Sequence, residues 1–271
     1  MSAKLISVNG EFLDQVSAFD RGLAYGDGLF ETVLIRHSLQ VFGQDHFNRL
    51  VSTAQKLKIP LPKNLSQNIT DFIDHLANKN EANGILKIIL TRGAGGRGYN
   101  PPELPMPTLI LMWFDPPQLP SENNFKGILL ARCEHPLPSR SALSGMKTLN
   151  RLDNVMARME ISGSNYAEGL MCDFDGHVIE GTMMNLFWVK DNTLHTPSLE
   201  DVGVHGIMRT QIMQRFETIC VCAKEDSILS ADELFLCNSV NGIWPVIEFK
   251  DRNWQIGPLT KRIQSEFLQF L

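Results

Sequence analysis

The sequence predicts a protein of mixed α and β structure with two domains. Segments with the apolar pattern of strands alternate with segments of helical three-to-four spacing along the chain. The 271 residues are long enough for two ordinary domains. Residues 115–124 have the proline-rich, polar composition of a linker. We therefore expect an N-terminal α/β domain over residues 1–114 and a larger C-terminal domain over residues 125–271.

The N-terminal half is expected to begin with a β-hairpin. Residues 5–8 and 11–13 have strand patterns, and the Asn9-Gly10 pair between them favours the positive φ angles of a tight turn. A glycine-rich turn over residues 20–28 follows. Three further strands are expected over residues 29–35, 84–90 and 108–114, and two helices over residues 45–58 and 66–80.

The strand over residues 29–35 places a hydroxyl among apolar side chains. Alternate residues of a strand point to the same face, so Thr32 shares its face with Phe30 and Leu34. Glu31 lies on the opposite face, where its neighbours are also apolar.

A glycine-rich loop after the strand over residues 84–90 contains the pattern G-x-G-x-x-G at Gly93, Gly95 and Gly98. In a nicotinamide-dependent oxidoreductase, a helix begins at this loop and directs its N-terminus at the dinucleotide. Here Pro101-Pro102 forbids such a helix within a few residues. We interpret the loop as presenting Arg97, a permanent cation that suits a carboxylate. A mobile turn with solvated arginines is the alternative.

The C-terminal half contains two features suited to binding an anion. A helix over residues 207–216 follows Val204-His205-Gly206, so its first N–H groups are available. A strand over residues 233–239 ends in the small polar pair Asn238-Ser239. The other elements expected here are strands over residues 127–133, 169–173, 177–180, 185–189 and 243–247, a helix after residue 150 and a helix from about residue 258.

Lys147 is the candidate nucleophile. It lies between the flexible pair Ser144-Gly145 and a helical pattern, is flanked by Met146 and Leu149, and has no acidic residue after it until Asp153. Burial disfavours the ammonium form, and a neutral lysine amine attacks carbonyl groups. The alternative is an ordinary lysine at a helix start, with its stem buried and its charge in water.

Composition excludes several classes of function. The net charge of -5, without a basic stripe interleaved with aromatic residues, argues against a nucleic-acid surface. The five cysteines lack C-x-x-C spacing, so neither a disulfide framework nor a metal site is expected. The N-terminus has no signal-peptide pattern, and the longest apolar run, Leu109 to Phe114, is too short to cross a membrane. A cytoplasmic location is therefore expected.

Lys147, Glu180 and the helix entry at Ile207 occur in an order that resembles the fold-type IV pyridoxal-phosphate enzymes. This family includes branched-chain aminotransferases, D-amino acid aminotransferases and aminodeoxychorismate lyases. The motifs that carry the resemblance are the Asn9-Gly10 turn with residues 20–32, residues 144–154, Glu180-Gly181-Thr182 with Asn185-Leu186-Phe187, and Gly206-Ile207-Met208-Arg209. The resemblance implies a small N-terminal α/β domain, a larger C-terminal pseudo-barrel domain with the cofactor between them, and a homodimer.

The resemblance also implies the cofactor, pyridoxal 5'-phosphate, and the residues that hold it. Lys147 would bond covalently to the cofactor aldehyde. Glu180 would keep the pyridine nitrogen protonated, which makes the ring an electron sink. The phosphate would be bound by Arg49, by the backbone N–H groups of Ile207 and Met208, and by Asn238 and Ser239.

Within the family, the sequence is most similar to the lyase branch. Arg97-Gly98-Tyr99 lacks the histidine of the Arg-x-His carboxylate trap of D-amino acid aminotransferases. Branched-chain aminotransferases usually have glycine at the position of Thr32 and a tyrosine near Leu152. The lyase branch converts 4-amino-4-deoxychorismate to 4-aminobenzoate and pyruvate in folate biosynthesis.

For that reaction the resemblance gives Lys147 a second role as the base. Thr32 would protonate the departing enolpyruvate, with a packed strand threonine as the alternative, and Arg97 would bind a substrate carboxylate. Two other functions stay open: an aminotransferase on the same fold, and a non-catalytic protein that binds a phosphate ligand at the Ile207 helix entry.

Overall fold

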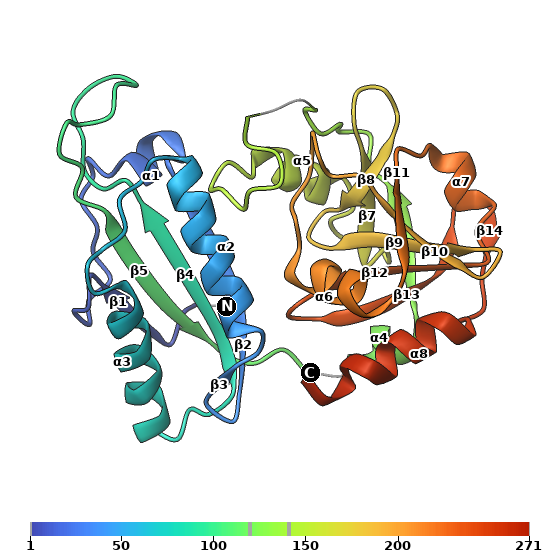
Figure 1. The fold of residues 1–271 in the computed structure, drawn as a ribbon, viewed down its shortest axis with the longest axis horizontal. Coiled ribbons are helices and arrows are strands. Elements are labelled where there is room, and N and C mark those ends of the chain that lie inside the picture. Colours follow the sequence, from blue (N-terminus) through green and yellow to red (C-terminus); the bar gives the residue numbers. More distant parts are fainter. Residues whose placement is uncertain (1, 119–120, 140–141, 271) are drawn as a thin grey trace. The chain divides into compact units, whose positions relative to one another are not determined.

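The computed structural model describes residues 2–118, 121–139 and 142–270, and the chain divides into two compact units (Figure 1). The first unit runs to Pro117 and also takes in Lys147–Asn150. The second unit contains Gln118–Met146 and the chain from Arg151 onward. Residues 119 and 120 of the predicted linker lie outside the described residues, and a short helix, α4 (Glu122–Lys126), begins inside the range predicted as linker.

The first unit is a five-stranded antiparallel sheet in the order β1-β5-β4-β2-β3, with two long helices and one short one. Its strands are β1 (Leu5–Val8), β2 (Gly28–Arg36), β3 (Leu39–Gln40), β4 (Gly84–Thr91) and β5 (Thr108–Phe114). Its helices are α1 (Arg21–Tyr25), α2 (Gly43–Lys56) and α3 (Leu65–Asn78).

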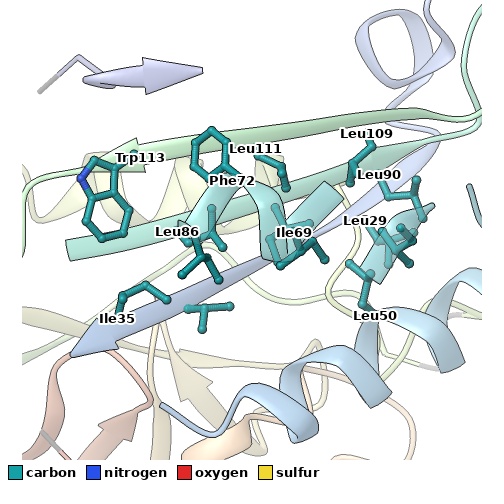
Figure 2. Close-up of a cluster of buried hydrophobic side chains, with 14 of the residues drawn as sticks. Leu29, Ile35, Leu50, Ile69, Phe72, Leu86, Leu90, Leu109, Leu111 and Trp113 are labelled. Atoms are coloured by element: carbon teal, nitrogen blue, oxygen red, sulfur yellow. The ribbon is translucent and has the colours of Figure 1, made fainter. Parts of the chain in front are cut away.

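The core of the first unit lies between one face of the sheet and the helices α2 and α3. Figure 2 shows Leu50 of α2 and Ile69 and Phe72 of α3 with side chains of the sheet, among them Leu86 and Trp113. All of these side chains are nearly inaccessible to solvent. The inward residues of β2 alternate with the residues of its other face, as expected for a strand.

The predicted turn at Asn9-Gly10 is confirmed, but the second strand of the hairpin is wrong. Asn9 and Gly10 have φ angles of 54° and 91°, and Val8 and Glu11 exchange two backbone hydrogen bonds of 2.8 and 3.0 Å. After this bridge the chain leaves the ladder, because the ring of Phe12 packs on α3, 4.3 Å from the ring centroid of His75. The strand β1 pairs with β5 instead.

The second unit is built on a nine-stranded sheet that closes on itself. Its strands are β6 (Ile128–Arg132), β7 (Glu168–Cys172), β8 (Val178–Gly181), β9 (Asn185–Lys190), β10 (Thr193–Pro197), β11 (Thr218–Val221), β12 (Glu233–Asn238), β13 (Gly242–Phe249) and β14 (Arg252–Asn253). Its further helices are α5 (Leu152–Glu160), α6 (Ile207–Arg215), α7 (Glu225–Leu229), α8 (Pro258–Phe267) and a final turn of 3-10 helix, Leu268–Phe270.

Closure of this sheet occurs at one residue pair. The strand β8 pairs with β7 along its length and with β9 through Glu180 and Asn185. The ring therefore passes through β9, β12, β13, β6, β7 and β8, while β10 and β11 extend it on one side. The predicted mixed α/β class and the pseudo-barrel of the second unit are confirmed. Among the described residues, no helix is both long and apolar enough to span a membrane.

Candidate active site

Lys147 and the residues that follow it lie along the end of β2, in the first unit. The backbone N–H of Phe30 donates to the Lys147 carbonyl at 3.0 Å, and the N–H of Leu149 donates to the Gly28 carbonyl at 2.9 Å. These bonds make Lys147–Asn150, here called the lysine segment, an extended addition to the strand. The Lys147 Nζ lies 4.4 Å from the centroid of the Phe30 ring, so its charge faces an aromatic surface.

The lysine segment differs from the predicted helix start. The helix α5 begins only at Leu152, and Thr148, the residue after Lys147, forms a β-bridge with Leu29. The two residues that bound the segment are joined within the second unit, where the Arg151 Nη2 donates to the Met146 carbonyl at 3.0 Å. Inside the segment, the Asn150 amide donates to the Gly26 carbonyl at 3.1 Å.

Gly145 fixes the approach of the chain to the lysine. Its N–H donates to the Gly203 carbonyl at 2.9 Å, and its carbonyl accepts from the His205 N–H at 3.1 Å. Its φ angle of 74° lies in the left-handed region, and a Cβ here would come within 2.9 Å of the His205 ring. The flexible pair identified in the sequence therefore contains a residue that must be glycine for conformational and for steric reasons.

Glu180 is buried at the closing pair of the barrel. One oxygen of its carboxylate, Oε2, accepts from the Asn185 side-chain amide and from the Val204 N–H, each at 3.1 Å. The same region holds the Arg151 guanidinium, whose pKa is lowered by burial and partly restored by the charge of Glu180. Glu180 is thus a buried carboxylate that is fixed by its hydrogen-bond donors.

The helix α6 begins with an N-terminus that no side chain caps. Gly206 is its N-cap residue, and a Cβ at this position would lie 1.9 Å from the Asn185 Oδ1. Because the first N–H groups of a helix have no partner within the helix, those of Ile207 and Met208 belong to a set suited to an anion. The sequence prediction of a helix entry at Ile207 is confirmed.

Asn238 is the last residue of β12, and Ser239 follows it in a tight turn. The Asn238 Oδ1 accepts from the N–H groups of Val240 and Asn241 at 3.0 and 2.6 Å, and its amide nitrogen donates to the Met183 carbonyl at 3.3 Å. The Asn238 side chain therefore shapes the turn, while Ser239 is buried beside it.

Arg49 belongs to α2 in the first unit. Its Nε and Nη2 donate to the two oxygens of Glu31 at 2.7 and 2.6 Å. Glu31 lies on the core-facing side of β2 and also receives the Nδ1 of His46 at 2.6 Å. Burial by itself raises the pKa of the Glu31 carboxyl, but the Arg49 charge and the hydrogen bonds outweigh burial and lower it to about 2.

Thr32 is half-buried on the face of β2 that carries Phe30, and its partner across the ladder is Lys87 of β4. The Lys87 Nζ lies 5.4 Å from the centroid of the Phe30 ring. Lys87 and Lys147 therefore both lie over the ring of Phe30, and Thr32 is the next residue on the same face of β2. Lys87 is not among the site residues predicted from the sequence, although a single lysine within the apolar pattern of a central strand is a signal for such a role.

Arg97 is exposed in the glycine-rich loop, and the anchor of that loop is a different arginine. The Arg21 guanidinium donates to the carbonyls of Gly98 and Tyr99 at 3.1 and 2.9 Å and to the Asp27 carboxylate at 2.8 Å. No helix begins in the described residues 92–107, which removes the dinucleotide-binding interpretation.

Comparison of this chain with known proteins identifies its family. A model of the family described as amino-transferase class IV matches residues 28–249. The chain belongs to this family. Class IV aminotransferases are the fold-type IV enzymes that the sequence resembles, and they depend on pyridoxal phosphate. The chain is thus a pyridoxal-phosphate enzyme of class IV, and the predicted cofactor is confirmed.

Individual class IV relatives differ in the activity for which they are named. The chain is 34% identical to an aminodeoxychorismate lyase of Vibrio harveyi, over 95% of this chain and 97% of that protein. It is 30% identical to a putative branched-chain-amino-acid aminotransferase of Methanocaldococcus jannaschii, over 97% and 94%. The crystal structure of 4-amino-4-deoxychorismate lyase from Pseudomonas aeruginosa is similar, with a TM-score of 0.93, 38% identity and 98% coverage of both chains.

The side chains present fit the functional groups of the cofactor. In the first unit, Lys147 offers an amine beside an aromatic ring, and Arg49 offers a guanidinium held in a fixed plane. In the second unit, Glu180 offers an anchored carboxylate and α6 an uncapped N-terminus. An aldehyde, a phosphate and a protonated ring nitrogen are the partners that such groups prefer.

Proposed function

We propose that this class IV enzyme converts 4-amino-4-deoxychorismate to 4-aminobenzoate and pyruvate. The observation that carries the proposal is the grouping of an amine and a hydroxyl on one face of β2, where Lys147 lies over Phe30 and Thr32 is the next residue on that face. An elimination with loss of enolpyruvate needs a base and a proton donor, and these two residues supply them. The similarity to the lyases of Vibrio harveyi and Pseudomonas aeruginosa, over nearly the full chain, supports the same reaction.

In this proposal Lys147 first holds the cofactor and then acts as the base. Its Nζ takes the proton from the substrate carbon that bears the nitrogen, with a general-base advantage of about 10²–10⁴. The electron pair of that C–H bond enters the ring system as the neighbouring ether C–O bond breaks. The ring becomes aromatic and enolpyruvate leaves as its enolate. The Thr32 hydroxyl protonates the methylene carbon of the enolate, which gives pyruvate, and the proton that Lys147 took returns to Thr32, so both side chains regain their starting states.

Bound pyridoxal phosphate supplies an electron sink for the carbon that loses its proton. We assign Glu180 to the proton of the ring nitrogen, because its Oε2 is already fixed by two donors and a fixed carboxylate needs no reorganisation. We assign the phosphate to Arg49 and to the N–H groups of Ile207 and Met208. Asn238 and Ser239 are proposed to complete that set through the turn after β12.

Arg97 is proposed to bind a substrate carboxylate. Its loop is anchored at Gly98 and Tyr99 by Arg21, which limits how far the Arg97 backbone can move. The permanent charge of an arginine suits the carboxylates of a chorismate derivative. We also propose, from the resemblance alone, that the enzyme is a cytoplasmic homodimer, which light scattering of the purified protein tests for the oligomeric state.

The direct experiment incubates the purified enzyme with 4-amino-4-deoxychorismate and measures both products. We expect equal amounts of pyruvate and 4-aminobenzoate, and neither product with Lys147→Ala. Lys250→Ala is a matched control, since Lys250 is a half-exposed lysine that pairs with Glu225 in the second unit, and this variant should keep full turnover. Product formation by Lys147→Ala at the normal rate would refute the central assignment.

The second candidate function is an aminotransferase, which the similarity to the Methanocaldococcus jannaschii protein favours. The two functions differ when an amino donor is present alone. An aminotransferase converts its cofactor to the pyridoxamine form and releases a keto acid, whereas the proposed lyase leaves the cofactor unchanged. Rapid conversion with a branched-chain or a D-amino acid would reject the lyase.

A further inference from the structure

The buried carboxylate of Glu31 accepts hydrogen bonds from the guanidinium of Arg49 and the imidazole of His46. Its side chain is 1% exposed, and its two oxygens accept from the Nε and Nη2 of Arg49 and from the Nδ1 of His46. The strand β2 supplies the carboxylate, and α2 supplies the other two side chains three residues apart, on one face of the helix. All three residues belong to the first unit.

The bidentate contact determines the orientation of the guanidinium. A carboxylate that binds the Nε and Nη2 edge fixes the plane of the fork, because two parallel hydrogen bonds leave no free rotation. The Nη1 group lies at the opposite side of the planar fork and is directed away from Glu31. An arginine held only by its flexible side chain would instead lose rotamer entropy when it binds an anion.

His46 supports the carboxylate as a neutral ring. It is almost completely buried, and its pKa is lowered by burial, while the nearby charges of Arg49 and Lys147 lower it further. Because Glu31 is ionised and can only accept, the Nδ1 of His46 carries the hydrogen. Its Nε2 is buried and has no hydrogen-bond partner among the described residues, so the contact with Glu31 is the polar contact that fixes the ring.

We propose that Glu31 and His46 are positioning residues that hold Arg49 in the orientation that binds the cofactor phosphate. The inference rests on the proposed role of Arg49 and adds two residues to it. Glu31 fixes the plane of the guanidinium, and His46 holds Oε2 of the carboxylate, the oxygen that also accepts from Arg49 Nη2. A buried ion pair often contributes little net stability compared with apolar residues of similar size, so orientation is the property that this arrangement supplies.

The test compares the affinities for pyridoxal phosphate and for pyridoxal, which lacks the phosphate. The apoenzyme of each variant is titrated with either compound, and the absorbance of the lysine-bound form gives the dissociation constant. Glu31→Gln should lower the affinity for pyridoxal phosphate about tenfold or more, since the loss of a charged hydrogen bond has an effect of this size. The affinity for pyridoxal should stay unchanged. His46→Leu should lower the affinity for pyridoxal phosphate about threefold. His46→Asn keeps a donor near the position of Nδ1, so this variant should have the affinity of the wild type.

Asp27→Asn is the matched control. Asp27 is another carboxylate of this unit, and it forms ion pairs with the arginines Arg21 and Arg92. This variant should leave the ratio of the two affinities at the wild-type value. If Glu31 contributed only to general stability, Glu31→Gln would lower the affinities for both compounds equally, and that result would overturn the inference.

Two further outcomes are distinguishable. A Glu31→Gln enzyme that binds pyridoxal phosphate as tightly as the wild type would overturn the positioning role while leaving the function intact. A wild-type enzyme with no preference for pyridoxal phosphate over pyridoxal would overturn the proposed phosphate site itself. If Glu31→Gln does not fold, the comparison of His46→Leu with His46→Asn decides the inference, because equal affinities in that pair would reject it.

Discussion

Glu31 is expected to make the stability of this protein depend on acid pH. The pKa of its carboxyl is about 2 in the folded chain, against a usual value of 4.5. The ionised form therefore stabilises the folded state fully above pH 4.5, and this contribution is lost as the pH falls towards 2. The shift corresponds to about 3 kcal/mol, of which about 2 kcal/mol should be lost between neutral pH and about pH 3.

Urea unfolding of the wild type and of Glu31→Gln, each at neutral pH and at about pH 3, measures this contribution. At neutral pH the variant should be less stable by about 3–5 kcal/mol, because Arg49 stays buried without its charged partner. At about pH 3 the difference between the two proteins should shrink by about 2 kcal/mol, since only the wild type loses the contribution of Glu31. All other carboxyl groups are common to both proteins and cancel. A difference that stays constant between the two pH values would refute the reasoning.

Three substitutions test individual parts of the proposed site. Thr32→Val keeps the shape of the side chain, so we expect an unchanged cofactor spectrum and a kcat lower by about 100-fold or more; normal turnover would remove the proton-donor role. Glu180→Gln should still bind the cofactor, with kcat lower by about 100-fold, since the ring nitrogen loses its charged partner; an unchanged kcat would contradict that assignment. Gly206→Ala should lower the free energy of unfolding by about 1–3 kcal/mol, because the added Cβ would meet Asn185 at 1.9 Å, and a thermal melt equal to that of the wild type would argue against that crowding.

Local patterns were sufficient to predict several elements of the fold. The strand over residues 29–35 and the helix from Ile207 follow from alternation and from a glycine entry, and the structure contains both. The Asn9-Gly10 turn also depends only on its own backbone angles. The failed strand over residues 11–13 shows the limit of this reasoning, because Phe12 responds to a ring on α3 that is distant in sequence.

The candidate site was less predictable because its contacts are long-range. The position of Glu31 on an apolar face was visible in the sequence, and a buried carboxylate requires a partner. Nothing local identified that partner as Arg49, eighteen residues away. Likewise, the sequence drew attention to Arg97, whereas the loop is held by Arg21, whose partners lie 77 and 78 positions away. The partners of Arg21 are brought near by the pairing of β2 with β4, and Arg49 reaches Glu31 because α2 packs on β2, and no single segment encodes either arrangement.

The closing pair of the barrel explains how the carboxylate of Glu180 and the uncapped N-terminus of α6 are positioned together. Glu180 and Asn185 form the bridge that joins β8 to β9, and the Asn185 amide also donates to the Val204 carbonyl at 3.0 Å. Val204 returns a hydrogen bond to Glu180 and pairs with Gly145, two residues before the lysine. Gly206, two residues after Val204, is the N-cap of α6 and lies so near Asn185 that a Cβ there would collide with the Asn185 side chain. One strand bridge therefore positions the carboxylate, the helix entry and the approach to the lysine segment, and a change that loosens Asn185 must disturb all three.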